Sequence, residues 1–466
     1  MRPPLLAMTA AICLAGLHTA AQGPAAPEPA DSLQKWIANQ AIAIRSIDPN
    51  DEDFSDLEPL AAAIGPARVV QLGEPSHGAG SSFAAKARLI KFLHRRLGFD
   101  VVAWESGFYD VRLSQRAMRA GENAVTAAQR GILAVWSNAV EARPLFEYIR
   151  ASQSTARPID VAGIDLQISA GGTEQAFGAE LRAFAGKLAD PARRQQTEAV
   201  FEQTIAAHTR ITARQNRPAA ADFDEFQTVS EGLLVAINSD RPAFDAALGA
   251  REVAFIVRAI ENVRGRATSA SNRQRLESLP EAERISTDWN LRDTLMAENL
   301  RWLLDEEYPR RKVIVWAHNA HIMNGYFAPS WAGVHAEMPP NGMMSAGVSV
   351  AERLKDGVYT IALTTYEGDE AWTNGQRRGP IAPAAPGSFE TRLHALAKPY
   401  VFLDLRPARR DGHPMRTPQS LRISGYGPPT GPYGNDRVPD LTKAFDGVLF
   451  IDRMLPATMI CEGRCP

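Results

Sequence analysis

Cysteine is scarce in this sequence: its 466 residues include three, at positions 13, 461 and 465. Cys13 lies in an apolar N-terminal stretch, which leaves two cysteines near the C-terminal end. In an exported protein, a pair at this close spacing is typical of a small disulfide. The same spacing could begin a metal site, but no further Cys or nearby His completes one. We therefore expect a disulfide between Cys461 and Cys465.

A marked excess of charge of either sign is also missing. The chain has 51 Lys and Arg against 53 Asp and Glu, a formal net charge of −2. This balance does not favour nucleic acid or an anionic membrane surface as a partner. A hydrophobic content of 45% and a charged content of 22% are ordinary for a globular protein with a large core. Composition leaves the oligomeric state open.

No apolar run reaches the roughly 20 residues that a membrane-spanning helix needs. The apolar run at 5–17 follows Arg2 and precedes small residues, which is the pattern of a secretory signal. We expect residues 1–21 to be a signal peptide and residues 22–30 a flexible leader. The mature chain is then exported, to the periplasm or outside the cell, without stable membrane insertion. Lipidation of Cys13 is the less favoured alternative, because a large Ile precedes it.

Apolar runs of strand length alternate with helical patterns along the chain. Runs at 67–72 and 100–104 are separated by a single helical pattern, which predicts a βαβ unit with parallel strands. We predict an α/β fold: a mostly parallel central sheet flanked by helices, in one domain over residues 31–457 with a tail at 458–466. Further strands are expected at 158–164, 312–316, 357–364, 400–405 and 446–451.

Residues 173–304 show no convincing strand pattern, and they are rich in Ala, Glu, Gln and Arg. We interpret them as a large helical insertion packed on the sheet. Four side chains on neighbouring turns of its last helix are Arg292, Asp293, Met296 and Asn299. An ion-paired or solvated face is the favoured interpretation of these, and a place in the site is the alternative. Gly/Pro-rich stretches at 368–388 and 412–439 predict long irregular loops that cover an active site or bind a ligand.

Acids and imidazoles directly follow three of the predicted strands. The first strand ends in a Gly-Glu-Pro-Ser-His-Gly turn, in which Gly73 and Gly78 permit backbone angles that other residues cannot reach. The carboxyl ends of parallel strands meet at one edge of a sheet, where ligands bind. We therefore expect one shared cleft for five candidate catalytic residues: Glu74, His77, Glu105, His318 and His321.

This set of side chains is sufficient for hydrolysis of an ester by water. A neutral imidazole can take a proton from water near neutral pH, and a neighbouring carboxylate sets its tautomer. Further imidazoles could donate to a developing oxyanion. We predict that His77 is the general base, that Glu74 and Glu105 orient it, and that His318 or His321 stabilises the oxyanion.

Three other functions remain open at this stage. A serine nucleophile is disfavoured, because Ser76 and Ser106 are not in a G-x-S-x-G turn. A metal-dependent hydrolase or peptidase is the stronger rival, since three His and two Glu could hold Zn²⁺ or Mn²⁺, although no H-E-x-x-H helix is present. A non-catalytic binding protein on the same fold is the third alternative. The complete set of acids and imidazoles argues against it.

Four motifs occur together in this chain: the Gly-Glu-Pro-Ser-His-Gly turn, Trp-Glu-Ser-Gly around Glu105, Gly-Ile-Asp ending at Asp165, and Trp-Ala-His-Asn-Ala-His ending at His321. In this order they resemble the erythromycin esterase family, over about residues 31–457. The resemblance implies an α/β hydrolase with no metal and no cofactor. It also implies a small-molecule ester or lactone as substrate, with a macrolide as one candidate.

The resemblance implies roles for two further residues. The family has an Arg nine residues beyond its first motif His, and here that position holds Lys86, with Arg88 two residues further on. We expect Lys86 and Arg88 to position the substrate. Lys keeps the positive charge but loses the bidentate fork of Arg, so this departure bears on the substrate more than on the reaction.

Overall fold

The structure is a computed structural model that describes residues 29–188, 190–212, 218–279, 281–327, 343–371, 378–423, 425 and 436–460. The predicted signal peptide, most of the leader and the Cys461–Cys465 pair lie outside the described residues. The first helix, α1, spans Pro29–Gln40 and includes the last two residues of the predicted leader. No described helix is both long enough and apolar enough to cross a membrane.

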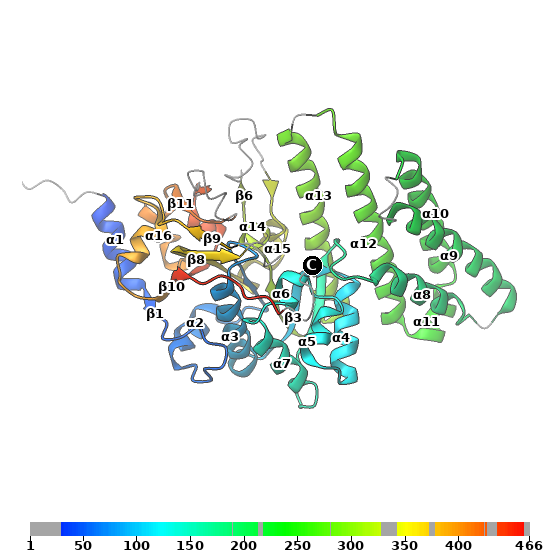
Figure 1. Cartoon of the computed structure of the whole chain (residues 1–466), viewed down its shortest axis with the longest axis horizontal. Helices are drawn as coiled ribbons and strands as arrows, with labels where there is room; N and C mark the ends of the chain where they lie inside the picture. The colour runs from blue at the N-terminus through cyan, green and yellow to red at the C-terminus, as the bar shows by residue number, and fades with distance from the viewer. Residues whose placement is uncertain are drawn as a thin grey trace, which may run out of the picture.

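Within the described part of the chain, one sheet of nine strands lies at the centre of the α/β region, with the order β1-β10-β13-β8-β2-β5-β3-β4 and with β9 paired to β8 (Figure 1). The run from β13 to β4 is parallel throughout, and β1, β9 and β10 pair antiparallel. The predicted mostly parallel sheet is therefore confirmed. The strands are β1 (Ile42–Ala43), β2 (Val69–Leu72), β3 (Phe99–Gly107), β4 (Asp160–Asp165), β5 (Lys312–Trp316), β8 (Val358–Ala371), β9 (Arg378–Ile381), β10 (Tyr400–Asp404) and β13 (Gly447–Met454).

The strands β2 and β3 are parallel, as the βαβ pattern predicts, but they are not neighbours. The strand β5 lies between them, and Trp316 at its end is in register with both Leu72 and Trp104. The loops that follow β2, β5 and β3 therefore emerge side by side. The loop with the two histidines after β5 is the middle one of the three.

Helices cover both faces of this sheet, so its central strands are buried on both sides. Val101 and Ala103 of β3 pack into one apolar core, and Val102 and Trp104 pack into the other. The helices outside residues 173–302 are α2 (Glu58–Ile64), α3 (Gly80–Leu97), α4 (Asp110–Ala120), α5 (Ala124–Gln129), α6 (Ala134–Ser137), α7 (Arg143–Ser152), α14 (Asn319–Ile322), α15 (Ala346–Leu354), α16 (Phe389–His394) and α17 (Leu441–Ala444).

The described residues between 173 and 302 are mostly helical, as expected, and their helices extend to one side of the sheet (Figure 1). The last helix, α13, contacts the end of β4, where the Asn299 amide donates a 2.8 Å hydrogen bond to the Ile164 carbonyl. The outer helices α9 and α10 lie farthest from the sheet. The helices are α8 (Thr173–Ala185), α9 (Pro191–Thr212), α10 (Ala220–Ser239), α11 (Arg241–Leu248), α12 (Ala250–Arg275) and α13 (Glu281–Trp302).

The two Gly/Pro-rich stretches contain more regular structure than the sequence predicts. The strand β8 continues to Ala371 and pairs with β9, so the first stretch includes a hairpin arm. The second stretch contains an antiparallel pair, β11 (Gln419–Leu421) and β12 (Asp436–Val438). A third short pair joins β6 (Tyr326–Phe327) to β7 (Met343–Met344). The prediction of wholly irregular loops was wrong, because backbone pairing satisfies amide groups that a long loop would leave to water.

Candidate active site

Two glycines let the loop after β2 pass close to its neighbours. A Cβ at Gly73 would lie 1.9 Å from Oδ1 of Asn319, and a Cβ at Gly78 would lie 1.5 Å from the Ala371 carbonyl oxygen. Neither glycine has a positive φ, so the turn does not use the backbone freedom that they permit. These positions need glycine because there is no room for a side chain.

Glu74 is a buried carboxylate that accepts hydrogen bonds on both oxygens. His77 Nδ1 lies 2.8 Å from Oε1, and the Trp136 indole donates to the same oxygen at 2.9 Å. The Lys86 ammonium donates to Oε2 at 2.8 Å. Burial opposes the charged form of Glu74, but Lys86 and His77 outweigh it and lower the pKa of this carboxyl. Glu74 is therefore ionised at neutral pH.

The bond to Glu74 decides how His77 presents its second ring nitrogen. A carboxylate can only accept, so Nδ1 carries the proton and neutral His77 keeps a free lone pair on Nε2. Nε2 lies 3.9 Å from Oε1 of Glu105, and the ring is 5.3 Å from that of His318. A quarter of the His77 side chain remains exposed to solvent. His77 thus has the geometry of an oriented general base.

Glu105 is the second buried carboxylate of the cluster. Arg292 Nη2 donates to Oε1 at 2.8 Å, and the His318 backbone N–H donates to Oε2 at 2.8 Å. Arg292 also binds Asp165 through a 2.6 Å ion pair. Burial opposes ionisation of Glu105, but His321 and the other nearby positive groups hold its pKa well below the usual range.

His321 is a buried imidazole between two acids. Nδ1 lies 2.9 Å from Asp293 Oδ2, and Nε2 lies 3.2 Å from Glu105 Oε1. The ring stacks on Trp289 with centroids 4.5 Å apart. Burial opposes the charged form, but Asp293 and Glu105 outweigh it and raise the pKa of His321 to about 9. His321 is therefore a cation at neutral pH.

His318 has the opposite character. Its Nε2–H donates to the Pro75 carbonyl at 3.0 Å, and its Nδ1 accepts from the Ala320 N–H at 3.1 Å. Burial, helped by the neighbouring His77, lowers the pKa of His318 to about 3. The ring is therefore neutral, and its one N–H is bonded to the Pro75 carbonyl, which fixes the loop after β2. This arrangement differs from the expectation that the ring could donate to an oxyanion.

The two predicted substrate-positioning residues do not line the cleft. Lys86 is fully buried behind Glu74, and its ammonium also donates to the Ala317 carbonyl at 3.2 Å. Burial lowers the pKa of Lys86 to about 8, although Glu74 opposes this. Arg88 follows two residues later, about 200° further around α3, and forms an ion pair of 2.7 Å with Asp56. Lys86 can act only through Glu74, and Arg88 holds the 46–56 segment.

Four residues of the cluster were absent from the predicted set: Trp136, Asp165, Arg292 and Asp293. Asp165 carries the same signal as the others, since it stands at the end of a predicted strand. Arg292 and Asp293 lie on the insertion's last helix, where the sequence favoured an ion-paired face. Each is indeed ion-paired, but with residues of the site. Trp136 lies on a short helix with no local signal that points to the site.

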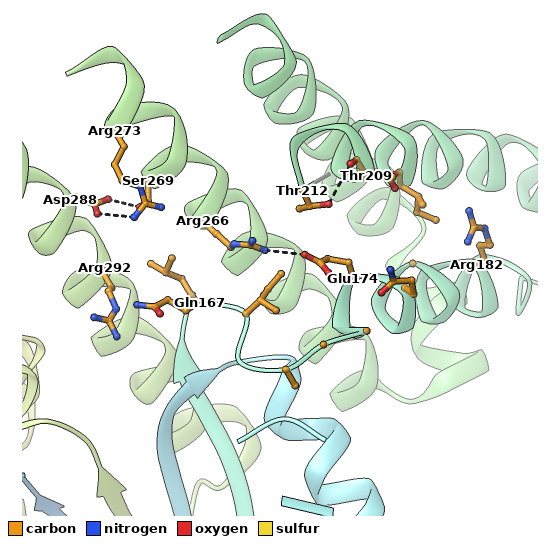
Figure 2. Close-up of a pocket in the computed structure, with 18 of the residues that line it drawn as sticks. Gln167, Glu174, Arg182, Thr209, Thr212, Arg266, Ser269, Arg273, Asp288 and Arg292 are labelled. Atoms are coloured by element: carbon orange, nitrogen blue, oxygen red, sulfur yellow. Dashed lines mark hydrogen bonds and ion pairs between the residues drawn. The ribbon is translucent and has the colours of Figure 1, made fainter. Parts of the chain in front are cut away.

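A cavity of about 1140 Å³ adjoins the cluster, between residues 166–178 and the helical insertion (Figure 2). Trp289 and Arg292 line this cavity and also contact His321. Gln167 lies beside Arg292 at the same end. The cavity therefore includes two residues that contact His321, whereas none of the five predicted catalytic residues is part of its described lining, and its volume is large enough for a small-molecule substrate.

Two alternative mechanisms, a serine nucleophile and a metal ion, can be compared with the contacts around His77. Ser76 donates to Glu370 at 2.6 Å, and Ser106 accepts from the Leu133 N–H at 3.0 Å, so neither hydroxyl is paired with His77. Among the residues that the structure describes, no group of three or more His, Cys, Asp or Glu side chains is arranged to hold a metal ion.

A carboxylate–imidazole pair facing a second carboxylate, at the carboxyl edge of a parallel sheet, defines a class of protein: an α/β protein with a hydrolase-type site. The erythromycin esterase family model matches residues 94–454, and the chain belongs to that family. A Bacillus subtilis relative named "Putative hydrolase YbfO" is 27% identical, over 96% of this chain and 97% of its own. Erythromycin esterase type II of Escherichia coli is 23% identical, over 73% of this chain and 78% of its own.

Solved structures show the same fold. A Bacillus cereus protein is similar with a TM-score of 0.70 and 21% identity, over 92% of this chain and 98% of its own. An erythromycin esterase variant in an open conformation is similar with a TM-score of 0.65 and 15% identity, over 91% of this chain and 100% of its own. The family, together with the Bacillus subtilis and Escherichia coli relatives, supports a hydrolase.

Proposed function

We propose that this protein hydrolyses a carboxylic ester or lactone by attack of water, with His77 as the general base and without a metal ion. The observation that carries this proposal is the 2.8 Å contact between His77 Nδ1 and buried, ionised Glu74. This contact holds the proton on Nδ1, so Nε2 keeps a lone pair that can accept a proton from water.

The attacking water lies between two acceptors in this mechanism. His77 Nε2 and Glu105 Oε1 are 3.9 Å apart, which suits a water that donates one hydrogen to each. As the water oxygen attacks the carbonyl carbon, Nε2 takes one proton and the carbonyl oxygen becomes an oxyanion. When the tetrahedral intermediate collapses, the C–O bond breaks, and His77 returns the proton to the departing alkoxide.

Arg292 is the best-placed group for the oxyanion. Its guanidinium is a fifth exposed, lines the cavity and already contacts Glu105, so it lies where negative charge develops. His321 is only 4% exposed, and its protonated ring donates to Asp293 and to Glu105, the carboxylate that Arg292 also binds. We assign His321 and Asp293 to positioning Arg292 and Glu105.

The substrate is a small molecule that carries the ester, and the protein meets it after export. The name of the Escherichia coli relative makes a macrolide lactone one candidate. The apolar run at 5–17, preceded by Arg2, supports export to the periplasm or beyond.

A panel of esters and lactones, macrolides included, tests this function with wild type and His77→Asn side by side. We expect the variant to lose at least about a hundredfold in kcat on any substrate that the wild type turns over. His394→Asn, which changes an exposed histidine bound to Asp452, is the matched control and should retain wild-type kcat. Full activity in His77→Asn would contradict the mechanism. Tight ligand binding with no turnover of any ester would indicate a binding protein instead.

A further inference from the structure

The cavity beside the catalytic cluster is lined by more positive than negative side chains. Its described lining includes four arginines and two acids: Arg182, Arg266, Arg273, Arg292, Glu174 and Asp288. Positive charge in a cavity with low-dielectric walls raises the local concentration of anions and disfavours cations. An anionic ester is therefore favoured only where one of these arginines is not already neutralised by a carboxylate of the protein.

Three of the four arginines have carboxylate partners at hydrogen-bond distance. Arg182 binds Glu202 through two contacts of 2.6 and 2.9 Å. Arg273 Nη1 donates to Asp288 at 3.2 Å. Arg292 is held by Glu105 and Asp165, as described above. These guanidinium groups are neutralised by the protein itself.

Arg266, on α12, is different. Its Nη1 is buried and has no hydrogen-bond partner among the described residues. The carboxylate that faces it, Glu174, is 4.0 Å away. Figure 2 shows Arg266 reaching from α12 toward Glu174 at the start of α8. Burial lowers the pKa of Arg266, and Glu174 and Asp110 offset this only in part. Nη1 itself is covered, but 30% of the Arg266 side chain is exposed and lines the cavity, so a ligand there can accept from the accessible part of the guanidinium.

We propose that this cavity selects esters that carry a carboxylate remote from the bond that is cleaved, and that Arg266 binds this carboxylate. The planar guanidinium matches a carboxylate in a charge-assisted pair. Arg292 lies at the catalytic end of the same cavity, so one substrate can contact both arginines. Arg266 is then a specificity residue for the proposed hydrolysis, and the inference rests on that function.

The test compares monoesters of 4-nitrophenol with dicarboxylic acids, from glutarate to sebacate, against neutral fatty-acid esters of equal chain length. We expect the wild type to favour the anionic ester by about tenfold or more in kcat/KM at the best length. Arg266→Met should abolish this preference through KM and change kcat/KM for the neutral esters less than twofold. Arg266→Lys should restore part of the preference. Arg275→Met is the control and should keep the preference, because Arg275 is an ion-paired arginine on the same helix that does not belong to the described cavity lining.

A second readout separates this inference from the proposed hydrolysis. The matching anilides contain an amide in place of the ester, and calorimetry measures their binding without turnover. Tighter binding of the anionic anilide to wild type than to Arg266→Met, by about tenfold, supports the carboxylate site even if no ester is cleaved. Equal binding of that anilide to both proteins overturns it. Two results of the ester series would also overturn it. In the first, wild type shows no preference for the anionic ester at any chain length. In the second, Arg266→Met keeps the wild-type preference.

Discussion

His318 and His321 lie three residues apart, yet their environments leave the first neutral and the second positively charged at neutral pH. The first has only a carbonyl and a backbone N–H as partners, and burial lowers its pKa to about 3. The second is also buried, but Asp293 and Glu105 raise its pKa to about 9. The same side chain is thus a neutral clamp in one place and a fixed cation in the other.

The raised pKa of His321 predicts a dependence of stability on pH. The folded protein holds this proton up to about pH 9, whereas the unfolded chain releases it near 6.5. Its contribution is therefore fully present below pH 6.5 and is lost as the pH rises through 9. The contribution is at most roughly 3 kcal/mol. Lys86, whose pKa is lowered to about 8, acts in the opposite direction between pH 8 and pH 9.5. The His321 effect is therefore measured by urea unfolding of wild type at pH 6 and pH 9.5 against a variant without the His321 partner.

Asp293→Asn removes the nearest acid that holds the His321 proton. We expect the fall in unfolding free energy between pH 6 and pH 9.5 to be smaller in this variant than in wild type. The comparison uses the difference between the two pH values, so a general loss of stability in the variant does not affect it. An identical fall in both proteins would show that the His321–Asp293 pair does not carry the effect.

The helix α3 shows how one element serves two unrelated tasks. Lys86 points under the catalytic loop, where it supports Glu74, and Arg88 points the other way to Asp56. Both cations are buried, so each is held by its own partner. Their proximity in sequence says nothing about a shared role, because two steps along a helix turn the side chain through about 200°.

These two faces predict different outcomes for two matched substitutions. Lys86→Met should lower kcat by about tenfold or more, because Glu74 without its cation favours the protonated form and no longer orients His77. Arg88→Met should leave the kcat of the folded protein within twofold of wild type. It should lower the free energy of unfolding by roughly 3 kcal/mol, because it leaves Asp56 without its buried partner.

Steady-state kinetics and urea unfolding on the same preparations measure both effects. Asp56→Asn, which breaks the Arg88 pair from its other side, should match Arg88→Met in direction. A loss of kcat in Arg88→Met, with the fold intact, would instead support the substrate-positioning role that the sequence predicts for Arg88.

At the scale of the whole molecule, segments far apart in sequence together provide the hydrogen-bond partners of the Glu74 and Glu105 carboxylates. Glu74 binds Trp136 of α6 and Lys86 of α3, and Glu105 binds Arg292 of α13. With their oxygens engaged in this way, these acids favour orientation of His77 over ligation of a metal ion.

Removal of divalent metals should therefore leave ester hydrolysis unchanged. The check is kcat/KM of the purified protein before and after dialysis against a chelator, together with elemental analysis. Retained activity is the expected result. Loss of activity that stoichiometric Zn²⁺ or Mn²⁺ restores would favour the metal-dependent hydrolase instead.

Export makes a separate prediction about the whole chain. Protein recovered from the compartment outside the inner membrane should begin near residue 22, with Cys461 and Cys465 joined. Intact mass spectrometry with and without reduction measures both features. A chain that keeps residues 1–21, or one with two free thiols at its end, would contradict the corresponding expectation.

The sequence by itself determined that acids and imidazoles follow parallel strands, and this was enough to place Glu74, His77, Glu105 and His321 near one another. Runs of apolar residues specify buried strands locally, and parallel strands bring their carboxyl ends to one edge. The order of the strands was decided only in the tertiary structure. Nothing local indicates that β5 lies between β2 and β3, because that order depends on packing between distant segments.

Tertiary structure also decided which partner each catalytic side chain has. Arg292 and Asp293 reach the site because the helical insertion packs α13 against the end of β4, a contact between residues more than 120 positions apart. The charge of an imidazole depends on such partners and on burial, neither of which is a property of its neighbours in sequence. The residue types of the site were therefore readable from the chain, whereas their protonation and division of labour required the fold.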